Sequence, residues 1–379
     1  MNNEQSVLLK LIKQSQFGLS EPINLSGIDM SILYNEALSQ AVLGLVASEI
    51  PTNYLTKKWN QFIYKQKSLC IRYCYIENEL KIILDKAEIP FVIIKGNASA
   101  INYNDPTRRS MGDIDFLVPP ELYEKTKDVI KSSGYSLGRD NGRHTEFKIE
   151  KQYFEVHHHF SHEIDIEKYL LEGINNREFA LIEGYEFPML PKLANGLVIL
   201  DHLRNHLKRG LGLRHIVDWM MYVHCNLDDV FWYDSFQPVV KEYGMEMLAC
   251  VVTRMCQLYL GLPNTITWCK CADDNLCNDL LECTLLGGNF GQRNGKGGSI
   301  ESAKANMNRV GMFHWLQSAG ENNWNAYHRH HWLKHFCWIY QSFRYLRQAF
   351  DSGRNFEKIR ADLYRGKVRA ELLKKLNIK

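Results

Sequence analysis

Residues 91–118, FVIIKGNASAINYNDPTRRSMGDIDFLV, constrain the fold more than any other part of the chain. The opening run is short and apolar and ends at Gly96, which predicts a buried strand followed by a turn. A helix-like segment and a basic loop then lead to a second strand, DIDFLV. Because strand side chains alternate between faces, Asp113 and Asp115 project to one side while Ile114 points into a core. Such close carboxylates repel each other, and either water or a divalent metal can relieve the repulsion.

The regions around this stretch have different periodicities. Apolar residues recur at helical intervals before residue 88 and again after about residue 189. Between them an amphipathic helix ends at Gly134 and three strand-like segments follow. The sequence therefore predicts an α/β (α+β) unit with a mixed sheet, flanked by helical regions at both ends. The expected divisions are a helical region at 1–88, the α/β unit at 89–188, a helical bundle completing the cleft at 189–285, and a Gly-rich loop with aromatic and basic helices at 286–379.

Composition narrows the class of protein. The 379 residues are enough for two or three compact units, and a net charge of +3 gives no reason to expect stable DNA binding. The chain opens with no signal-peptide pattern and contains no apolar run that could span a bilayer. Ten cysteines without such a signal are most simply free thiols. We therefore expect a cytoplasmic protein without a membrane partner.

Two later segments carry further candidate residues. In QYFEVHHHF, alternation places Glu155, His157 and His159 on one face and His158 on the other. This alternation, with no cysteine nearby, argues against a zinc site made by the three consecutive histidines.

In the helical segment DHLRNHLKRGLGLRHIVDW, His202 and His206 lie one turn apart, and so do Arg214 and Asp218. The two histidines can serve either packing or function. Asp218 is interpreted as an ion-pair partner of Arg214.

In combination these residues resemble the DNA polymerase beta-like nucleotidyltransferase superfamily and, more narrowly, a bacterial family labelled uncharacterised nucleotidyltransferases. The resemblance rests on Lys-Gly at 95–96 after an apolar strand, on RSMGDIDFLV starting at Arg109, and on Glu155 in FEVH. The helical segment at 202–218 is similar to the region after that family's catalytic sheet.

The resemblance implies an enzyme that moves a nucleoside monophosphate from an NTP, ATP foremost, to a hydroxyl or amine acceptor, releasing pyrophosphate. Residues 89–188 would form its catalytic domain. Two Mg²⁺ or Mn²⁺ ions would be held by the catalytic carboxylates Asp113, Asp115 and Glu155, since hard oxygen ligands suit these metals. The third carboxylate can also act as the base for the acceptor hydroxyl.

The candidate nucleotide-binding residues surround these carboxylates in sequence or follow them on helices. The turn at Gly96 would let backbone amides approach the triphosphate, and the loop arginines would offset phosphate charge. Superfamily members usually have Gly-Ser at this turn, where the present chain has Lys-Gly-Asn. The complete set is Lys95, Gly96, Asn97, Ser99, Arg108, Arg109, Gly112, His157, His202, His206 and Arg214.

The acceptor is left open: a small molecule, a sugar, a protein side chain or a tRNA end. One alternative is a catalytically inactive nucleotide-binding or interaction protein with the same fold. Another is a toxin-type nucleotidyltransferase acting on tRNA, supported by nine Lys or Arg against three Asp or Glu between residues 353 and 379. The Gly-rich stretch at 287–299 is predicted to be a mobile or a ligand-covering loop.

Overall fold

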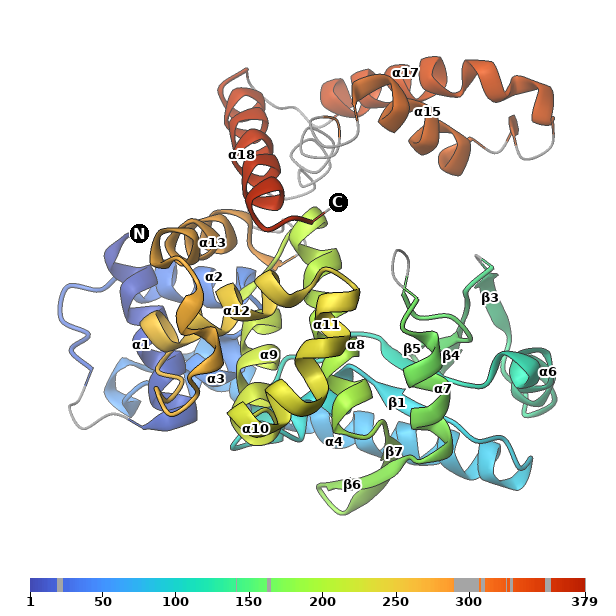
Figure 1. Ribbon diagram of the computed structural model, residues 1–379. Coiled ribbons are helices and arrows are strands. Elements are labelled where there is room, and N and C mark those ends of the chain that lie inside the picture. Colours follow the sequence, from blue (N-terminus) through green and yellow to red (C-terminus); the bar gives the residue numbers. More distant parts are fainter. Residues whose placement is uncertain are drawn as a thin grey trace. The chain divides into compact units, whose positions relative to one another are not determined.

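The computed structural model of the chain (Figure 1) describes residues 1–18, 23–140, 142–161, 165–289, 307, 311–324, 326–327, 330–351 and 356–378. The chain forms two compact units, one of Met1–Leu203 with Arg214–Ala272 and one of Arg204–Leu213 with Asp273–Lys379. Most of the predicted Gly-rich loop lies outside the described residues. In the part of the chain that is described, no helix is both long and apolar enough to cross a membrane.

The first unit contains a seven-stranded sheet with the order β3-β4-β5-β2-β1-β7-β6. The strands are β1 (Val92–Ile94), β2 (Ile114–Leu117), β3 (Leu137–Asp140), β4 (His144–Ile149), β5 (Gln152–His157), β6 (Glu178–Ile182) and β7 (Tyr185–Met189). Strand β2 is antiparallel to β1 and parallel to β5, and β1 is parallel to β7. The predicted α/β architecture with a mixed sheet is therefore confirmed.

Helices precede and follow the sheet. Up to residue 272 they are α1 (Asn3–Phe17), α2 (Met30–Ser39), α3 (Leu43–Ala47), α4 (Lys57–Lys86), α5 (Gly96–Ala100), α6 (Tyr123–Ser132), α7 (Glu167–Asn175), α8 (Lys192–Arg209), α9 (Leu213–Asn226), α10 (Asp229–Phe231), α11 (Gln237–Glu242) and α12 (Glu246–Met255). Short η helices are η1 (Thr52–Tyr54), η2 (Pro106–Arg108), η3 (Pro120–Leu122), η4 (Trp232–Phe236), η5 (Cys256–Leu260) and η6 (Trp268–Cys271). Later elements are α13 (Asp274–Gly287), α15 (Met312–Asn323), η8 (His331–Phe336), α17 (Cys337–Asp351) and α18 (Phe356–Lys375).

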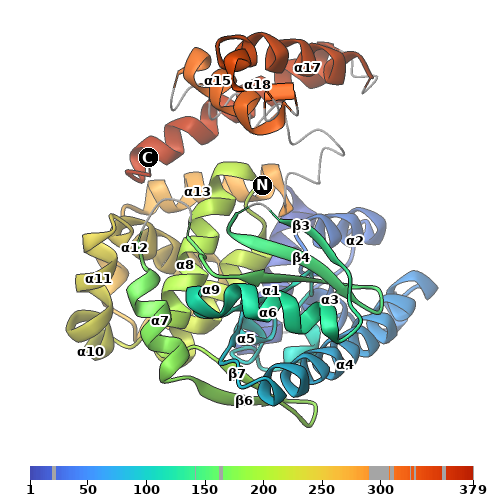
Figure 2. The same cartoon turned by 90° about the vertical axis from the view of Figure 1, so that its right-hand side faces the viewer.

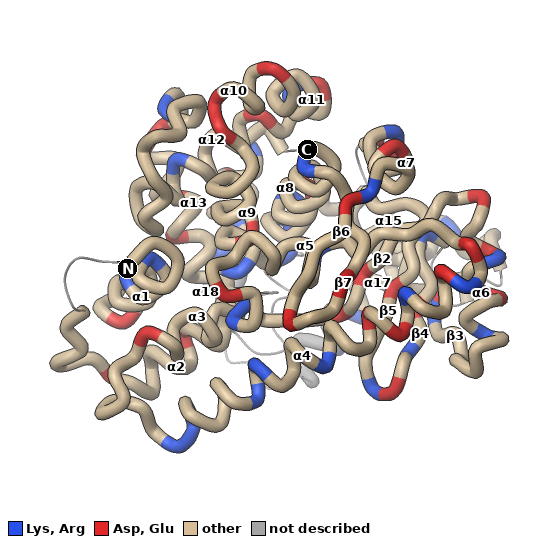
Figure 3. Tube along the Cα trace, turned by 90° about the horizontal axis from the view of Figure 1, so that it is seen from below, with Lys and Arg blue, Asp and Glu red and all other residues tan. Residues whose placement is uncertain are grey.

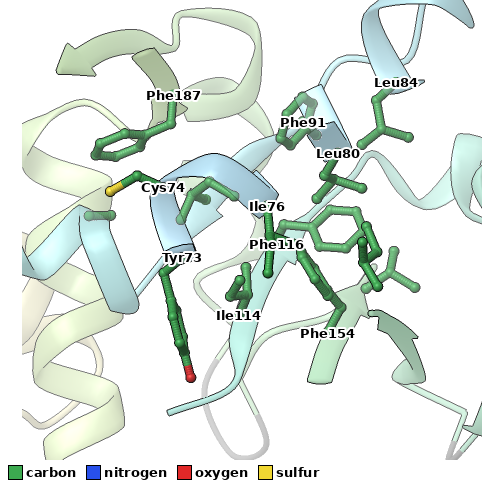
Figure 4. Packing of buried hydrophobic residues seen from close by; sticks show 14 of the residues in the cluster. Tyr73, Cys74, Ile76, Leu80, Leu84, Phe91, Ile114, Phe116, Phe154 and Phe187 are labelled. Atoms are coloured by element: carbon green, nitrogen blue, oxygen red, sulfur yellow. The ribbon is translucent and has the colours of Figure 1, made fainter. Parts of the chain in front are cut away.

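One face of the sheet packs against α4 and α6. Ile114 and Phe116 of β2 point into this core with Phe154 of β5, as the alternation of side chains predicts. Figure 4 shows them gathered with side chains of α4, including Ile76 and Leu80. Figure 2 shows α6 alongside β3 and β4. Because this face is filled by apolar side chains, the charged residues of β2 and β5 lie on the opposite face.

The outer surface of α6 is polar, which marks this helix as the solvent boundary of the core. Lysine and carboxylate pairs alternate along it, Lys127 with Glu124 at 2.7 Å and Lys131 with Asp128 at 3.3 Å (Figure 3). Exposed pairs of this kind contribute little to stability, typically about 0–1 kcal/mol each.

Candidate active site

A row of carboxylates crosses the face of the sheet opposite the core. The parallel pairing of β2 with β5 places Asp115 directly beside Glu155, and the antiparallel pairing of β4 with β5 places Glu146 on the other side of Glu155. Asp113 precedes β2 by one residue and is exposed. Of the three carboxylates proposed from the sequence, Asp115 and Glu155 therefore come from adjacent strands and share one face of the sheet, and Asp113 directly precedes β2.

Asp115 is the most buried of these carboxylates, at 8% exposure. Its Oδ1 accepts a hydrogen bond from Lys95 Nζ at 2.8 Å and lies 2.9 Å from His157 Nε2. Burial by itself raises the pKa of Asp115, but the Lys95 ammonium and the His157 contact outweigh it and hold the pKa below its usual range. Asp115 is therefore an ionised carboxylate inside the sheet.

Asp113 has the opposite electrostatic environment. Its pKa is raised by partial burial and then by the negative charges of Asp115 and Glu155. The remaining repulsion in this row is of the kind that a divalent cation relieves, and carboxylate oxygens are the donors that Mg²⁺ and Mn²⁺ prefer. The donor atoms of these carboxylates thus suit a hard divalent metal.

Lys95 reaches Asp115 from an unusual backbone turn between β1 and α5. Its φ of 58° and ψ of −135° lie in a backbone region that residues other than glycine rarely adopt. The next residue, Gly96, also has a positive φ of 33°. The ammonium group lies 5.2 Å from the ring centroid of Phe160, a cation–π distance. The strained turn therefore holds a lysine cation against the carboxylate row.

Two other predicted nucleotide contacts in this turn are buried. Asn97 is fully buried and donates from Nδ2 to Glu77 Oε2 at 2.8 Å, while Ser99 is 2% exposed. We therefore assign the Asn97 side chain to supporting the turn and not to contacting a nucleotide.

Arg109 also has a structural partner. Its guanidinium, 3% exposed, binds Asp218 through two bonds, Nε to Oδ1 at 2.7 Å and NH2 to Oδ2 at 2.8 Å. The hydroxyl of Tyr103 donates to the same carboxylate at 2.6 Å. Asp218 thus pairs with Arg109 rather than with Arg214, which corrects the sequence interpretation. The spacing along α9 could not indicate this, because Arg109 comes from a distant loop.

Arg108 and Arg214 differ in their hydrogen-bond partners. Arg108 is bound to Glu49 at 2.9 Å and Asp105 at 3.0 Å. Arg214 donates from NH1 to the Ser110 carbonyl at 3.3 Å, and its buried Nε has no hydrogen-bond partner among the described residues. A side chain added at Gly112 would lie 3.9 Å from Arg214 NH1, so this guanidinium borders the residue before Asp113.

Of the two predicted histidines at 157 and 159, only the first contacts the carboxylates. His157 is buried, with Nε2 2.9 Å from Asp115 Oδ1 and 3.3 Å from Glu155 Oε2. Burial lowers the pKa of His157, but its hydrogen bonds to Asp115 and Glu155 outweigh burial and raise it. His159 lies beyond the end of β5, with Nδ1 3.8 Å from Glu167 Oε1, so it does not continue the row as alternation had predicted.

The two histidines of α8 belong to different units, His202 to the first and His206 to the second. His202 has its ring centroid 5.1 Å from that of His215. His206 lies one turn later on α8.

His144 is a residue of this face that the sequence reasoning missed. It lies on β4 directly opposite His157, with Nε2 3.7 Å from Glu155 Oε2. The signal was the two-residue turn at 150–151, which joins Ile149 to Gln152 and thereby fixes the register of every later pair.

Comparisons with known proteins address the family. A family model described as uncharacterised nucleotidyltransferase matches residues 30–261. A search of curated proteins finds no match. Among solved structures, an antigenic nucleotidyltransferase-like protein from Paracoccidioides brasiliensis is 15% identical with a TM-score of 0.30, and the match covers 46% of the present chain and 90% of that protein.

Proposed function

The chain belongs to the family of uncharacterised nucleotidyltransferases, and we propose that it transfers a nucleoside monophosphate from an NTP, ATP foremost, to a hydroxyl or amine acceptor. The observation that carries this proposal is the pairing of Asp115 with Glu155 on one face of the sheet, with Asp113 directly before β2. The acceptor is a small molecule, a sugar, a protein side chain or a tRNA end.

The three carboxylates would hold two Mg²⁺ or Mn²⁺ ions, with Asp113 and Asp115 shared and Glu155 completing the second position. When bound, such ions polarise the α-phosphoryl group and stabilise charge on the leaving pyrophosphate. The raised pKa of Asp113 supports this assignment, because it reflects burial first and then the negative charges of Asp115 and Glu155.

The protein's own groups would then align and neutralise the reactants. The acceptor oxygen bonds to the α-phosphorus, the bond from that phosphorus to the bridging oxygen breaks, and pyrophosphate leaves with the electron pair. Glu155 takes the proton of the acceptor. Lys95 and Arg214 are the cations best placed beside the row, and both side chains can donate to phosphate oxygens.

Incubation with α-labelled NTPs, Mg²⁺ and a cell extract tests this function. We expect the wild-type protein to transfer label. In the double variant Asp113→Asn/Asp115→Asn the rate of transfer should fall on the order of 10³-fold, because several kcal/mol of transition-state stabilisation is removed. Asp128→Asn on α6 is the matched control, because Asp128 lies on the exposed surface of that helix. Label transfer that survives the double substitution would contradict the metal assignment. No transfer, combined with nucleotide binding that ignores Mg²⁺, would support the inactive nucleotide-binding alternative.

A further inference from the structure

Two imidazoles and one carboxylate converge between β4 and β5. Glu155 Oε2 lies 3.3 Å from His157 Nε2 and 3.7 Å from His144 Nε2. One ligand atom from each of the three residues lies within 4.8 Å of the others. Ligand atoms about 2.0–2.2 Å from a tetrahedral zinc ion are separated by about 3.3–3.5 Å, so the two measured separations are close to those of a metal site.

The sheet fixes this arrangement. His144 and His157 are direct partners in the β4–β5 ladder, with ring centroids 4.8 Å apart, and Glu155 precedes His157 by two residues on the same face. His157 Nε2 also lies 2.9 Å from Asp115 Oδ1, so zinc binding at this nitrogen replaces its hydrogen bond with Asp115. Side chains on paired strands have less freedom than side chains on loops, which favours a pre-formed site.

The donor set indicates which ion would bind. Mg²⁺ requires oxygen ligands, whereas imidazole suits zinc and other transition metals. Two histidines and one carboxylate are a donor set of zinc sites that keep one position open. The sequence had argued against zinc because His158 faces away from His157, but the third ligand comes from the neighbouring strand.

We propose that His144, Glu155 and His157 bind a zinc ion. The inference rests on the proposed function in one respect, which is that Glu155 is also the third ligand assigned to Mg²⁺. Zinc and the second Mg²⁺ therefore compete for Glu155, and micromolar zinc inhibits nucleotidyl transfer.

The experiment is titration of the metal-depleted full-length protein with Co²⁺, whose visible absorption reports four-coordinate geometry, followed by displacement with Zn²⁺. We expect visible bands without the thiolate charge-transfer band that cysteine ligands produce, complete displacement by Zn²⁺, and no displacement by millimolar Mg²⁺. Substitution of a ligand, His144→Ala or the more conservative His144→Asn, lowers zinc affinity at least about ten-fold. Circular dichroism establishes that each variant is folded.

His158→Ala is the matched control, because His158 stands against Tyr123 with ring centroids 4.1 Å apart instead of facing Glu155. It should bind zinc as the wild type does. Absence of the cobalt bands, or unchanged affinity in both folded His144 variants, would overturn the proposal.

Asp113→Asn separates this inference from the proposed function. It removes a carboxylate assigned to Mg²⁺ but none of the three zinc ligands, so it should lose nucleotidyl transfer and keep wild-type zinc affinity. Zinc binding by a wild-type protein that transfers no label contradicts the proposed function alone. Label transfer in a protein that gives no cobalt bands contradicts the zinc site alone.

Discussion

Lys95 Nζ and His157 Nε2 both contact Oδ1 of Asp115, so two nitrogen atoms stabilise one buried carboxylate. Glu77 of α4, a buried carboxyl group that contacts Asn97, shows the opposite arrangement. It is 2% exposed, and its Oε2 accepts from Asn97 while its Oε1 has no hydrogen-bond partner in the described structure. Burial raises the pKa of Glu77 to about 8, against a partial lowering by Asn97. This carboxyl group is therefore protonated in the folded protein at neutral pH.

The protonation of Glu77 predicts a pH dependence of stability. Its folded pKa of about 8 lies above the ordinary value of 4.5, so its full contribution is present below pH 4.5 and is lost as pH rises through 8. Between these values the free energy of unfolding falls by about 1.4 kcal/mol per pH unit from this group. We expect Glu77→Gln to abolish that slope in urea unfolding measured from pH 5 to pH 9.

Asp85→Asn is the control for this measurement, because Asp85 lies on the same helix but is exposed. It should leave the slope unchanged. A wild-type slope that persists in Glu77→Gln would show that another group carries the pH dependence.

Among single residues, sequence reasoning succeeded where the information was local. The alternation within one strand was sufficient to place Ile114 in the core and Asp115 on the opposite face, because that period belongs to the strand itself. It failed for Asn97 and Arg109, whose partners lie on α4 and α9. A residue type and its neighbours indicate a charge but not which distant group neutralises it.

At the scale of elements, the Arg109–Asp218 pair joins the loop before β2 to α9. Both side chains are at most 4% exposed, so removing one charge leaves the other buried without its partner. We expect Asp218→Asn to lower the free energy of unfolding by about 3–5 kcal/mol, measured by urea denaturation.

Arg108→Gln is the comparison for that variant. Arg108 is adjacent in sequence but a third exposed, and its ion pairs are at the surface, so its loss should cost no more than about 1 kcal/mol. Equal effects of the two substitutions would show that burial does not distinguish these pairs.

The strands show where periodicity stops being informative. The segments that became β3, β4 and β5 were predicted from their alternation. In contrast, β7 could not be predicted from local pattern. It contains Pro188, which is unfavourable in a strand, and it pairs with β1 across a long stretch of sequence. The order of strands likewise depends on long-range pairing, which is why Glu146 and His144 were not among the candidates.

At the scale of the whole molecule, all ten cysteines are free thiols. Eight of the cysteine side chains are at most 8% exposed, so packing and not cross-linking accounts for most of them. The unfolding temperature should therefore be the same, within about 1 °C, with and without a reducing agent. A decrease of several degrees on reduction, measured by differential scanning calorimetry, would reveal a stabilising disulfide and contradict this prediction.

The Arg109–Asp218 pair also has a consequence for synthesis on the ribosome. The two residues are 109 positions apart, so at a translation rate of about 5–20 residues per second Asp218 is made roughly 5–20 s after Arg109. During that interval β2 and β5 are synthesised, but the nascent chain still lacks the carboxylate that neutralises Arg109. The Arg109–Asp218 pair cannot form until α9 leaves the exit tunnel, so solvent or a chaperone must shield the charge of Arg109 until then.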